Sequence, residues 1–362
     1  MSFSPARLSV ARQRRLLNQK GFAERLGVAQ HSVSRWEKGL TVPDDATVTE
    51  ISKVLAYPIR FFYCVDIEAP EASLVSFRSQ TSMKAAVRDA ALSAGALGFL
   101  VSDWAEEHFS LPKTSVPDLH LLDPDSAARA LRAEWDLGEQ PISNMIHLLE
   151  SHGVRVFSLA ENSIRVNAFS LWRNDTPFVF LNTVKSAESS RFDAAHELGH
   201  LVLHQDGNTT GREAEDQANS FASAFLMPRA DVLAHVTDVY SLDQLMRFKV
   251  RWRVSLAALN YRLHKVGVTT DWRNRDFCIQ ISRQGFHKKE PRPIEREKSM
   301  VWEKILKILW SDKQTYKTIA DELSIPEEEI SALIYGVVGS GKTPPILPSS
   351  RLSLVNSLRT SG

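Results

Sequence analysis

Residues 191–201 read RFDAAHELGHL, and this stretch says more about the fold and chemistry than any other part of the chain. His196 and His200 are four residues apart, so both side chains lie on one face of a helix. Two imidazoles on one face can bind a single zinc ion, and Glu197 on the adjacent turn can take a proton from the hydrolytic water. Apolar neighbours predict a buried helix over 186–204, in which these polar groups need a partner. A solvated helix face is the alternative interpretation.

A catalytic zinc site usually has three protein ligands, so a third is expected downstream. A second helix that begins near residue 211 offers Glu215, whose position before the apolar stripe of that helix favours an inward carboxylate. Glu213 is the alternative ligand. Asn219, one turn further on, is placed to orient a ligand. His204 lies about 6 Å beyond His200 along the helix axis, which predicts a supporting or solvent-facing residue rather than a ligand.

The segments before the motif indicate a small sheet among helices. Apolar and β-branched runs at 154–159, 166–172 and 178–182 predict three strands. Helical spacing predicts helices over three earlier stretches: 82–109, 125–135 and 142–152. The expected fold class is mostly α with a small β-sheet, an α+β arrangement.

The motif and its surroundings also carry a family resemblance. Arg191–Leu201, Glu215–Pro228 and Trp252–Leu259 resemble the ImmA/IrrE metallopeptidases, over about 75–290 of the chain. The resemblance implies a zincin-like peptidase whose relatives cleave XRE-type repressors in stress responses or mobile elements. It implies three zinc ligands, which are His196, His200 and Glu215. It also implies that Glu197 is the general base and acid. Where the family often has a second acidic residue, this chain has Gln217.

The amino-terminal segment predicts a second, separate domain. Apolar residues at helical spacing indicate helices over 19–26 and 30–38, with Asn18 as N-cap and Gly27 in the turn between them. This spacing is typical of a helix-turn-helix unit. Residues 1–40 carry eight Lys and Arg against two Glu, which favours an anionic partner. A helical protein-interaction module with a solvated basic face is the alternative.

The segment from Asn18 to Pro43 resembles the DNA-binding domain of XRE-type phage repressors. The resemblance implies double-stranded DNA as a partner, with the second helix of the unit in the major groove. It implies five contact residues: Gln19, Gln30, His31, Ser34 and Arg35. Of these, Gln19 faces phosphate, because it lies at a helix amino terminus. Repressor-like domains often bind palindromes as dimers, so a homodimer is expected.

The carboxy-terminal region contains a second unit with helix-turn-helix shape over 316–335, which could dock on the peptidase or contact DNA. Residues 336–343, GVVGSGKT, fit the P-loop expression. A P-loop must join a strand to a helix in a large α/β domain, whereas Pro344 and a short tail follow here. Nucleotide binding is therefore not expected.

Length and composition agree with several soluble domains. The chain has 362 residues, a formal net charge of +1 and only two cysteines, which excludes a disulfide scaffold. We expect a helix-turn-helix domain at 1–66 and a peptidase domain at 75–270. A helical region at 271–338 and a flexible tail at 339–362 are expected to follow. No long uninterrupted apolar run and no signal-peptide pattern occur, so a cytoplasmic protein without a membrane span is expected.

Two classes of function agree with the sequence. In the first, a DNA-binding regulator also carries a zinc endopeptidase that cleaves a protein partner, such as an XRE-type repressor or an antitoxin-like protein, or itself. In the second, a DNA-binding sensor uses the metal site for structure or to receive a signal. A structural zinc site normally has a fourth protein ligand, and none is obvious nearby, so an open coordination position favours the enzyme.

Overall fold

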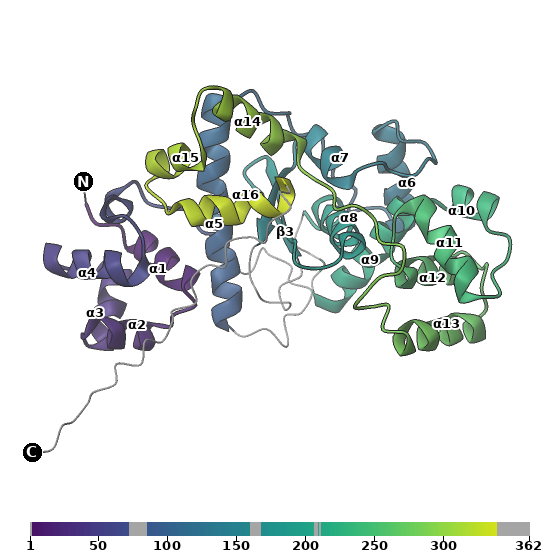
Figure 1. The fold of residues 1–362 in the computed structure, drawn as a ribbon, viewed down its shortest axis with the longest axis horizontal. Helices are drawn as coiled ribbons and strands as arrows, with labels where there is room; N and C mark the ends of the chain where they lie inside the picture. The colour runs from purple at the N-terminus through teal and green to yellow at the C-terminus, as the bar shows by residue number, and fades with distance from the viewer. Residues whose placement is uncertain (1, 72–84, 160–167, 206–208, 210, 339–362) are drawn as a thin grey trace, which may run out of the picture.

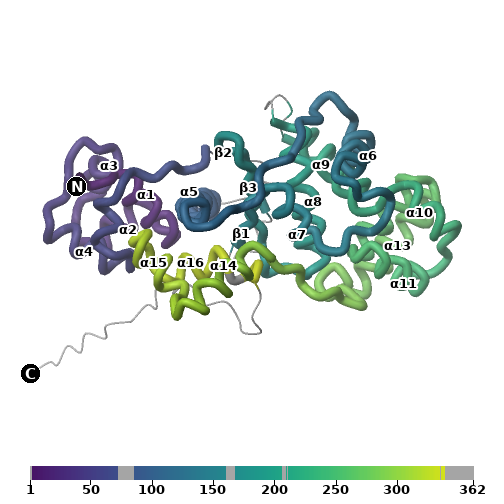
Figure 2. The backbone as a smooth tube through the Cα atoms, turned by 90° about the horizontal axis from the view of Figure 1, so that it is seen from above, coloured from purple at the N-terminus to yellow at the C-terminus, as the bar shows by residue number. Residues whose placement is uncertain are grey.

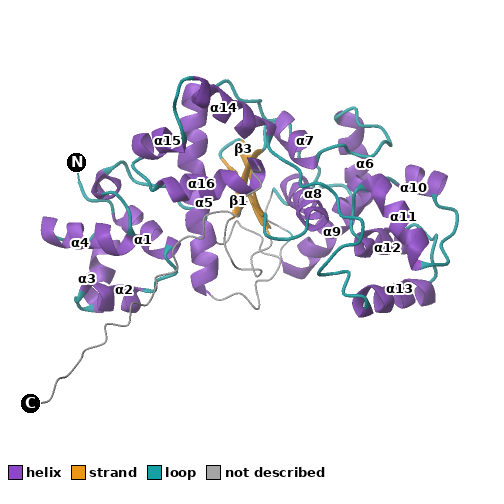
Figure 3. Ribbon diagram, in the orientation of Figure 1, coloured by secondary structure: helices purple, strands orange, loops and turns teal. Residues whose placement is uncertain are grey.

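The computed structural model of the protein describes residues 2–71, 85–159, 168–205, 209 and 211–338. The molecule is elongated, with the amino-terminal helices at one end and the helices of residues 229–283 at the other (Figure 1). Helices dominate and three short strands lie near the centre (Figure 3). This composition confirms the predicted α+β class.

The amino-terminal domain is a helix-turn-helix unit flanked by further helices. Its elements are α1 (Pro5–Arg14), α2 (Gln19–Leu26), α3 (Gln30–Glu37), α4 (Asp45–Leu55) and the 3₁₀ turn η1 (Ile59–Tyr63). Asn18 caps α2 by accepting a hydrogen bond from the backbone N–H of Gly21. Gly27 ends α2 with φ 70°, a left-handed conformation that favours glycine.

The core of this domain contains apolar residues from all of these elements, among them Leu8, Phe22, Val33, Ile51, Leu55, Phe61 and Phe62. Ile59 is apolar but lies at the edge of this core, where it is 44% exposed. The short 3₁₀ turn directs Phe61 and Phe62 inward instead.

A three-stranded sheet lies at the centre of the molecule. It contains β1 (Arg155–Leu159), β2 (Ala168–Arg173) and β3 (Thr176–Asn182) in the order β1-β3-β2. β1 is parallel to β3, and β2 is antiparallel to it. The three predicted strands are confirmed within their described residues, while positions 166 and 167 lie outside them.

Two helices cover the two faces of this sheet, namely α5 (Ala85–His108) and α8 (Ala187–Leu203). Side chains alternate between faces along a strand. Phe180 of β3 contacts α5 at Gly98, where a Cβ would lie 2.7 Å from the Phe180 ring. Ser170 of β2 faces α8 on the other side, where its hydroxyl donates to Glu197. α8 therefore lies against a rigid, buried sheet.

The remaining helices extend the fold in two directions. They are α6 (Pro124–Glu134), α7 (Met145–Ser151), α9 (Gly211–Leu226), α10 (Arg229–His235), α11 (Leu242–Trp252), α12 (Leu256–Lys265), α13 (Asp271–Arg283), α14 (Met300–Ser311), α15 (Tyr316–Leu323) and α16 (Glu327–Val338). α7 begins later than the predicted 142 because Asn144 caps it. α14–α16 return to the sheet, where α16 packs on β1 (Figure 2).

Two sequence features that suggest other functions are explained by packing. α5 is long and apolar enough to cross a membrane, but 67% of its apolar window is buried inside the protein. Gly336, the first residue of the P-loop-like run, belongs to α16 and follows no strand. Positions 339–343 of that run, and the expected flexible tail, lie outside the described residues.

Candidate metal centre

The HELGH motif lies in α8, a helix buried along most of its length. Its three polar residues are almost fully buried, with His196 1%, Glu197 2% and His200 8% exposed. Gly199 lets α9 approach closely, because a Cβ there would lie 3.0 Å from the Phe221 ring and 3.2 Å from a backbone carbon of α9. This approach brings Glu215 of α9 to the two histidines.

Three donor atoms converge at this point. His196 Nε2 lies 3.1 Å from His200 Nε2 and 3.4 Å from Glu215 Oε2, and His200 Nε2 lies 3.5 Å from Glu215 Oε1. Donors about 2.0–2.1 Å from a tetrahedral zinc ion are roughly 3.3 Å apart. The donor set and its spacing therefore fit zinc. Glu213, the alternative ligand, accepts a hydrogen bond from Gln217 at 3.3 Å and lies outside this cluster.

Asn219 fixes the orientation of His196. Its Oδ1 lies 3.1 Å from His196 Nδ1. Because an amide oxygen only accepts, Nδ1 carries the proton and the lone pair of Nε2 faces the other two donors. This contact agrees with the orienting role that the sequence suggests for Asn219.

A longer relay fixes the orientation of His200. Its Nδ1 lies 2.9 Å from His204 Nδ1, and His204 Nε2 lies 3.0 Å from Gln217 Oε1. Since the Gln217 oxygen accepts, His204 Nε2 donates to it and His204 Nδ1 accepts from His200. The lone pair of His200 Nε2 then faces the cluster. An amide at position 217 can thus orient the site where the resembled family often has an acidic residue.

Glu197 is held by a residue that sequence reasoning missed. Its Oε2 accepts a hydrogen bond of 2.7 Å from Ser170 Oγ, and the same hydroxyl lies 3.2 Å from the Glu197 backbone oxygen. The only sequence signal for Ser170 is a polar residue within an otherwise apolar strand. The contact holds the carboxylate against β2, on the helix that also carries both histidines.

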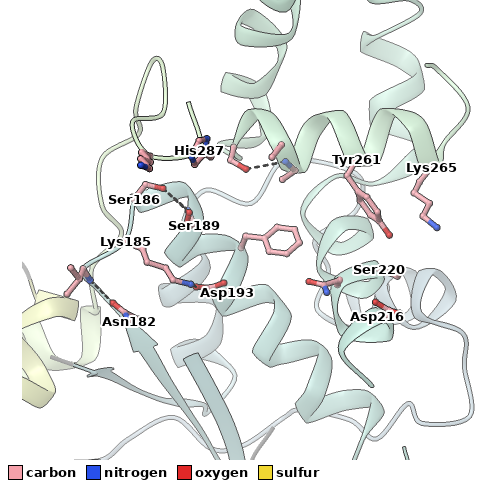
Figure 4. Close-up of a pocket in the computed structure, with 17 residues that line it drawn as sticks. Asn182, Lys185, Ser186, Ser189, Asp193, Asp216, Ser220, Tyr261, Lys265 and His287 are labelled. Atoms are coloured by element: carbon pink, nitrogen blue, oxygen red, sulfur yellow. Dashed lines mark hydrogen bonds and ion pairs between the residues drawn. The ribbon is translucent and has the colours of Figure 1, made fainter. Parts of the chain in front are cut away.

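A cavity of about 1110 Å³ lies close to the cluster, although its described lining includes neither the three donors nor Glu197 (Figure 4). Its walls come from α8, α9, α12, residues 182–186 and residues 287–288. Asn219 joins the two features, because it lines the cavity and also binds His196. The volume lies just above the roughly 300–1,000 Å³ range of small-molecule sites, so it has room for a large small molecule or for several residues of a polypeptide. No sequence pattern indicates this cavity.

The walls of the cavity are partly charged. A 2.7 Å ion pair between Lys185 and Asp193 crosses one side, while Tyr261 and Lys265 extend from α12 on another (Figure 4). Apolar residues such as Phe192 and Ala258 also line the cavity, so its walls combine polar and apolar surface.

The amino-terminal domain presents α3 to solvent. Gln30, His31 and Arg35 are exposed, and Ser34 is partly buried beside them. Gln19 is the first residue of α2, and its side-chain amide donates to Glu37 at 2.7 Å. The side-chain amide of Gln19 therefore joins α2 to α3, while the backbone at the start of α2 stays near the surface.

The basic patch is smaller than the sequence suggests. Arg7, Arg12 and Arg14 are only 4%, 8% and 5% exposed. Arg12 binds Glu37 at 2.5 Å, and Arg7 donates to a backbone oxygen. The counting of charges did not distinguish these internal arginines from the exposed cations, which are Lys20, Arg25, Arg35 and Lys38.

Two family models match the chain. Residues 8–62 match a helix-turn-helix family, and residues 149–264 match the IrrE N-terminal-like domain of peptidase family M78. The chain is therefore a DNA-binding protein of the helix-turn-helix class joined to a metallopeptidase-family domain. More closely, it is a fusion of an XRE-type helix-turn-helix domain with an ImmA/IrrE domain. No curated protein matches it.

Proposed function

We propose that this protein is a transcription regulator whose second domain is a zinc-dependent endopeptidase. The observation that carries the proposal is the spacing of three donors, His196, His200 and Glu215, beside the buried carboxylate of Glu197. A structural zinc site would normally have a fourth protein ligand. Among the described residues the cluster has three, which favours catalysis over a purely structural or sensing site.

The residues of the chain divide the work of peptide hydrolysis. Zinc held by the three donors would supply polarisation of the scissile carbonyl and a more acidic water. Glu197 accepts a proton from the attacking water and delivers it to the leaving amine as the C–N bond breaks. Ser170 positions Glu197 through their hydrogen bond. Burial of these groups excludes competing solvent and strengthens their electrostatic interactions.

The cavity beside the cluster is the proposed path of the substrate. A cleft of this size has room for several residues of an extended polypeptide. We infer that the substrate is a protein partner, such as an XRE-type repressor or an antitoxin-like protein, or the chain itself, in a stress or mobile-element response. Cleavage of a repressor would change transcription directly.

The enzymatic proposal is tested by comparing the wild type with Glu197→Gln in growing cells. Proteomic mapping of new protein amino termini should show one or a few that occur with the wild type and disappear with the variant. Both proteins should contain one zinc per chain, because Glu197 is not a ligand. Equal sets of amino termini, with zinc present in both, would contradict the enzyme proposal and favour the sensor.

For the other domain, we propose that α3 reads the major groove of duplex DNA at a palindromic operator bound by two copies of the chain. DNA as a partner also implies a cytoplasmic protein. Arg35→Ala should weaken binding to the chain's own upstream DNA by about 1–3 kcal/mol if Arg35 contacts a base. The exposed Arg60, outside the unit, gives a matched control, Arg60→Ala. Footprinting measures the difference, and light scattering of the complex measures the copy number.

A further inference from the structure

Residues 315–336 repeat the architecture of the amino-terminal unit, residues 18–39. In both units an eight-residue helix is capped by a polar side chain, ends in a left-handed residue and is followed three residues later by the second helix. The equivalent pairs are Asn18 and Thr315, Gly27 (φ 70°) and Ser324 (φ 56°), and Gln30 and Glu327. The backbone closes both turns alike, with N–H to O distances of 3.1 Å for Val28 to Ala23 and 3.0 Å for Ile325 to Ala320.

The same positions are buried in the two units. The inward residues of the first unit and their counterparts in the second are Phe22, Ala23, Val33 and Trp36, and Ile319, Ala320, Ile330 and Leu333. Caps, turn, hydrogen bonds and core therefore coincide, although the family match of the helix-turn-helix covers only residues 8–62. The carboxy-terminal pair of α15 and α16 is a second helix-turn-helix unit by its geometry.

The two units differ on the face that would read DNA. In α3 this face exposes Gln30 and Arg35. The counterparts in α16 are Glu327, which is exposed and acidic, and Ala332, which is 3% exposed. A carboxylate at the start of a helix suits the helix dipole but is repelled by phosphate. Of the counterparts of the α3 contact residues, Glu327 and Glu328 are exposed and acidic, Ser331 is partly buried and Ala332 is buried. The exposed part of this face therefore repels phosphate, which opposes its entry into a groove.

α16 binds the amino-terminal domain instead. Glu329 has no exposed surface, and its carboxylate lies 2.9 Å from Arg14 Nη2 and 2.7 Å from Arg15 Nη1. The hydroxyl of Tyr57 donates to the same carboxylate at 2.8 Å. All three partners belong to the amino-terminal domain, and Arg14 also donates to the Ala90 backbone oxygen of α5.

The other end of α16 is fixed to the sheet. A Cβ at Gly336 would lie 2.0 Å from Thr183 Oγ1 and 2.2 Å from Ser158 Oγ, so only glycine allows this approach. Thr183 follows β3, directly after Asn182, which lines the cavity. α16 therefore spans from the DNA-binding domain to the edge of the sheet beside the candidate cleft (Figure 2).

We propose that residues 315–336 are a second helix-turn-helix unit whose reading helix binds the amino-terminal DNA-binding domain rather than DNA. Glu329 is the central contact of this internal interface, and it fixes the orientation of the first unit on the rest of the chain. This proposal does not depend on peptidase activity. It assigns the second unit one partner, the arginine-bearing end of α1 together with Tyr57.

The interface is tested in the full chain by Glu329→Gln, with Glu328→Gln as the matched control one position away on the exposed surface. Loss of the buried charge leaves two guanidinium groups without their common carboxylate. Hydrogen exchange of α1 amides should therefore accelerate by about 100-fold in Glu329→Gln and stay unchanged in Glu328→Gln. Equal exchange in the two variants would overturn the proposal.

Two further measurements separate docking from general misfolding and from DNA binding. In an Arg15→Gln background, Glu329→Gln should have a clearly smaller effect than in the wild type, because the two residues act together. Additive effects would contradict the interface.

Addition of a mixed-sequence DNA duplex at low salt should leave hydrogen exchange in α16 unchanged. Any slowing of hydrogen exchange should occur in α3. Protection of α16 by the duplex would show that the second unit binds DNA and would overturn the proposal.

Discussion

Replacement of Asn219 by alanine should weaken zinc binding without removing a ligand. The His196 ring is 1% exposed, and the Asn219 amide oxygen, 3.1 Å from its Nδ1, is the acceptor that sets its tautomer. Without that acceptor, the metal-free ring is free to carry its proton on Nε2, and binding must then restore the other tautomer. Loss of this neutral hydrogen bond leaves the His196 Nδ1–H group without its acceptor. The cost is about 1.4–2.8 kcal/mol, or 10- to 100-fold in zinc affinity.

Competition with a chromophoric chelator at pH 7 measures this difference. Asn219→Asp supplies a carboxylate acceptor and should raise the affinity above that of the wild type. Ser220→Ala is the matched control, because Ser220 is the next residue of α9 and has no hydrogen bond to either histidine. If Asn219→Ala binds zinc as tightly as Ser220→Ala does, the orientation argument is wrong.

Three further predictions follow from other contacts. Ser170→Ala should retain zinc but lower the cleavage rate by about tenfold, since Glu197 loses a hydrogen bond of 2.7 Å; an unchanged rate would exclude the positioning role. Gly199→Ala should lower the free energy of unfolding by about 1–3 kcal/mol and weaken zinc binding, as denaturant titration and chelator competition would show, because its Cβ meets the backbone of α9. Burial alone would raise the pKa of Glu329, but Arg14 and Arg15 hold that pKa below its ordinary value near 4.5. Its stabilising contribution is therefore complete above that value and lost as the pH falls through the lower, folded-state pKa. The protection factors of α1 amides, which correct exchange for its intrinsic pH dependence, should therefore fall in acid in the wild type and much less in Glu329→Gln.

The sequence was sufficient where a short, periodic pattern controls the geometry. The spacing of His196 and His200 on one helix places both on one face whatever surrounds them. Caps such as Asn18 and a glycine such as Gly27 determine helix ends through local hydrogen bonds and backbone conformation. For this reason the helix-turn-helix unit, the three strands and the α+β class were predicted correctly.

Contacts between distant segments could not be predicted in the same way. Ser170 reaches Glu197 only because β2 packs against α8, and no local pattern encodes that packing. The apolar stripe of α9 favours Glu215 over Glu213 in the sequence, but the close approach at Gly199 that brings Glu215 to the histidines is a contact between distant segments. Arg14 is cationic in the sequence, but its burial against Glu329 depends on a segment over 300 residues away.

The central claim is that Glu215 completes a zinc site with the two histidines of α8. Metal analysis of purified wild type, Glu215→Ala and Glu213→Ala tests it directly. The structure predicts one zinc per chain in the wild type and in Glu213→Ala, and loss of zinc from Glu215→Ala. Zinc retained by Glu215→Ala at wild-type affinity would contradict the claim.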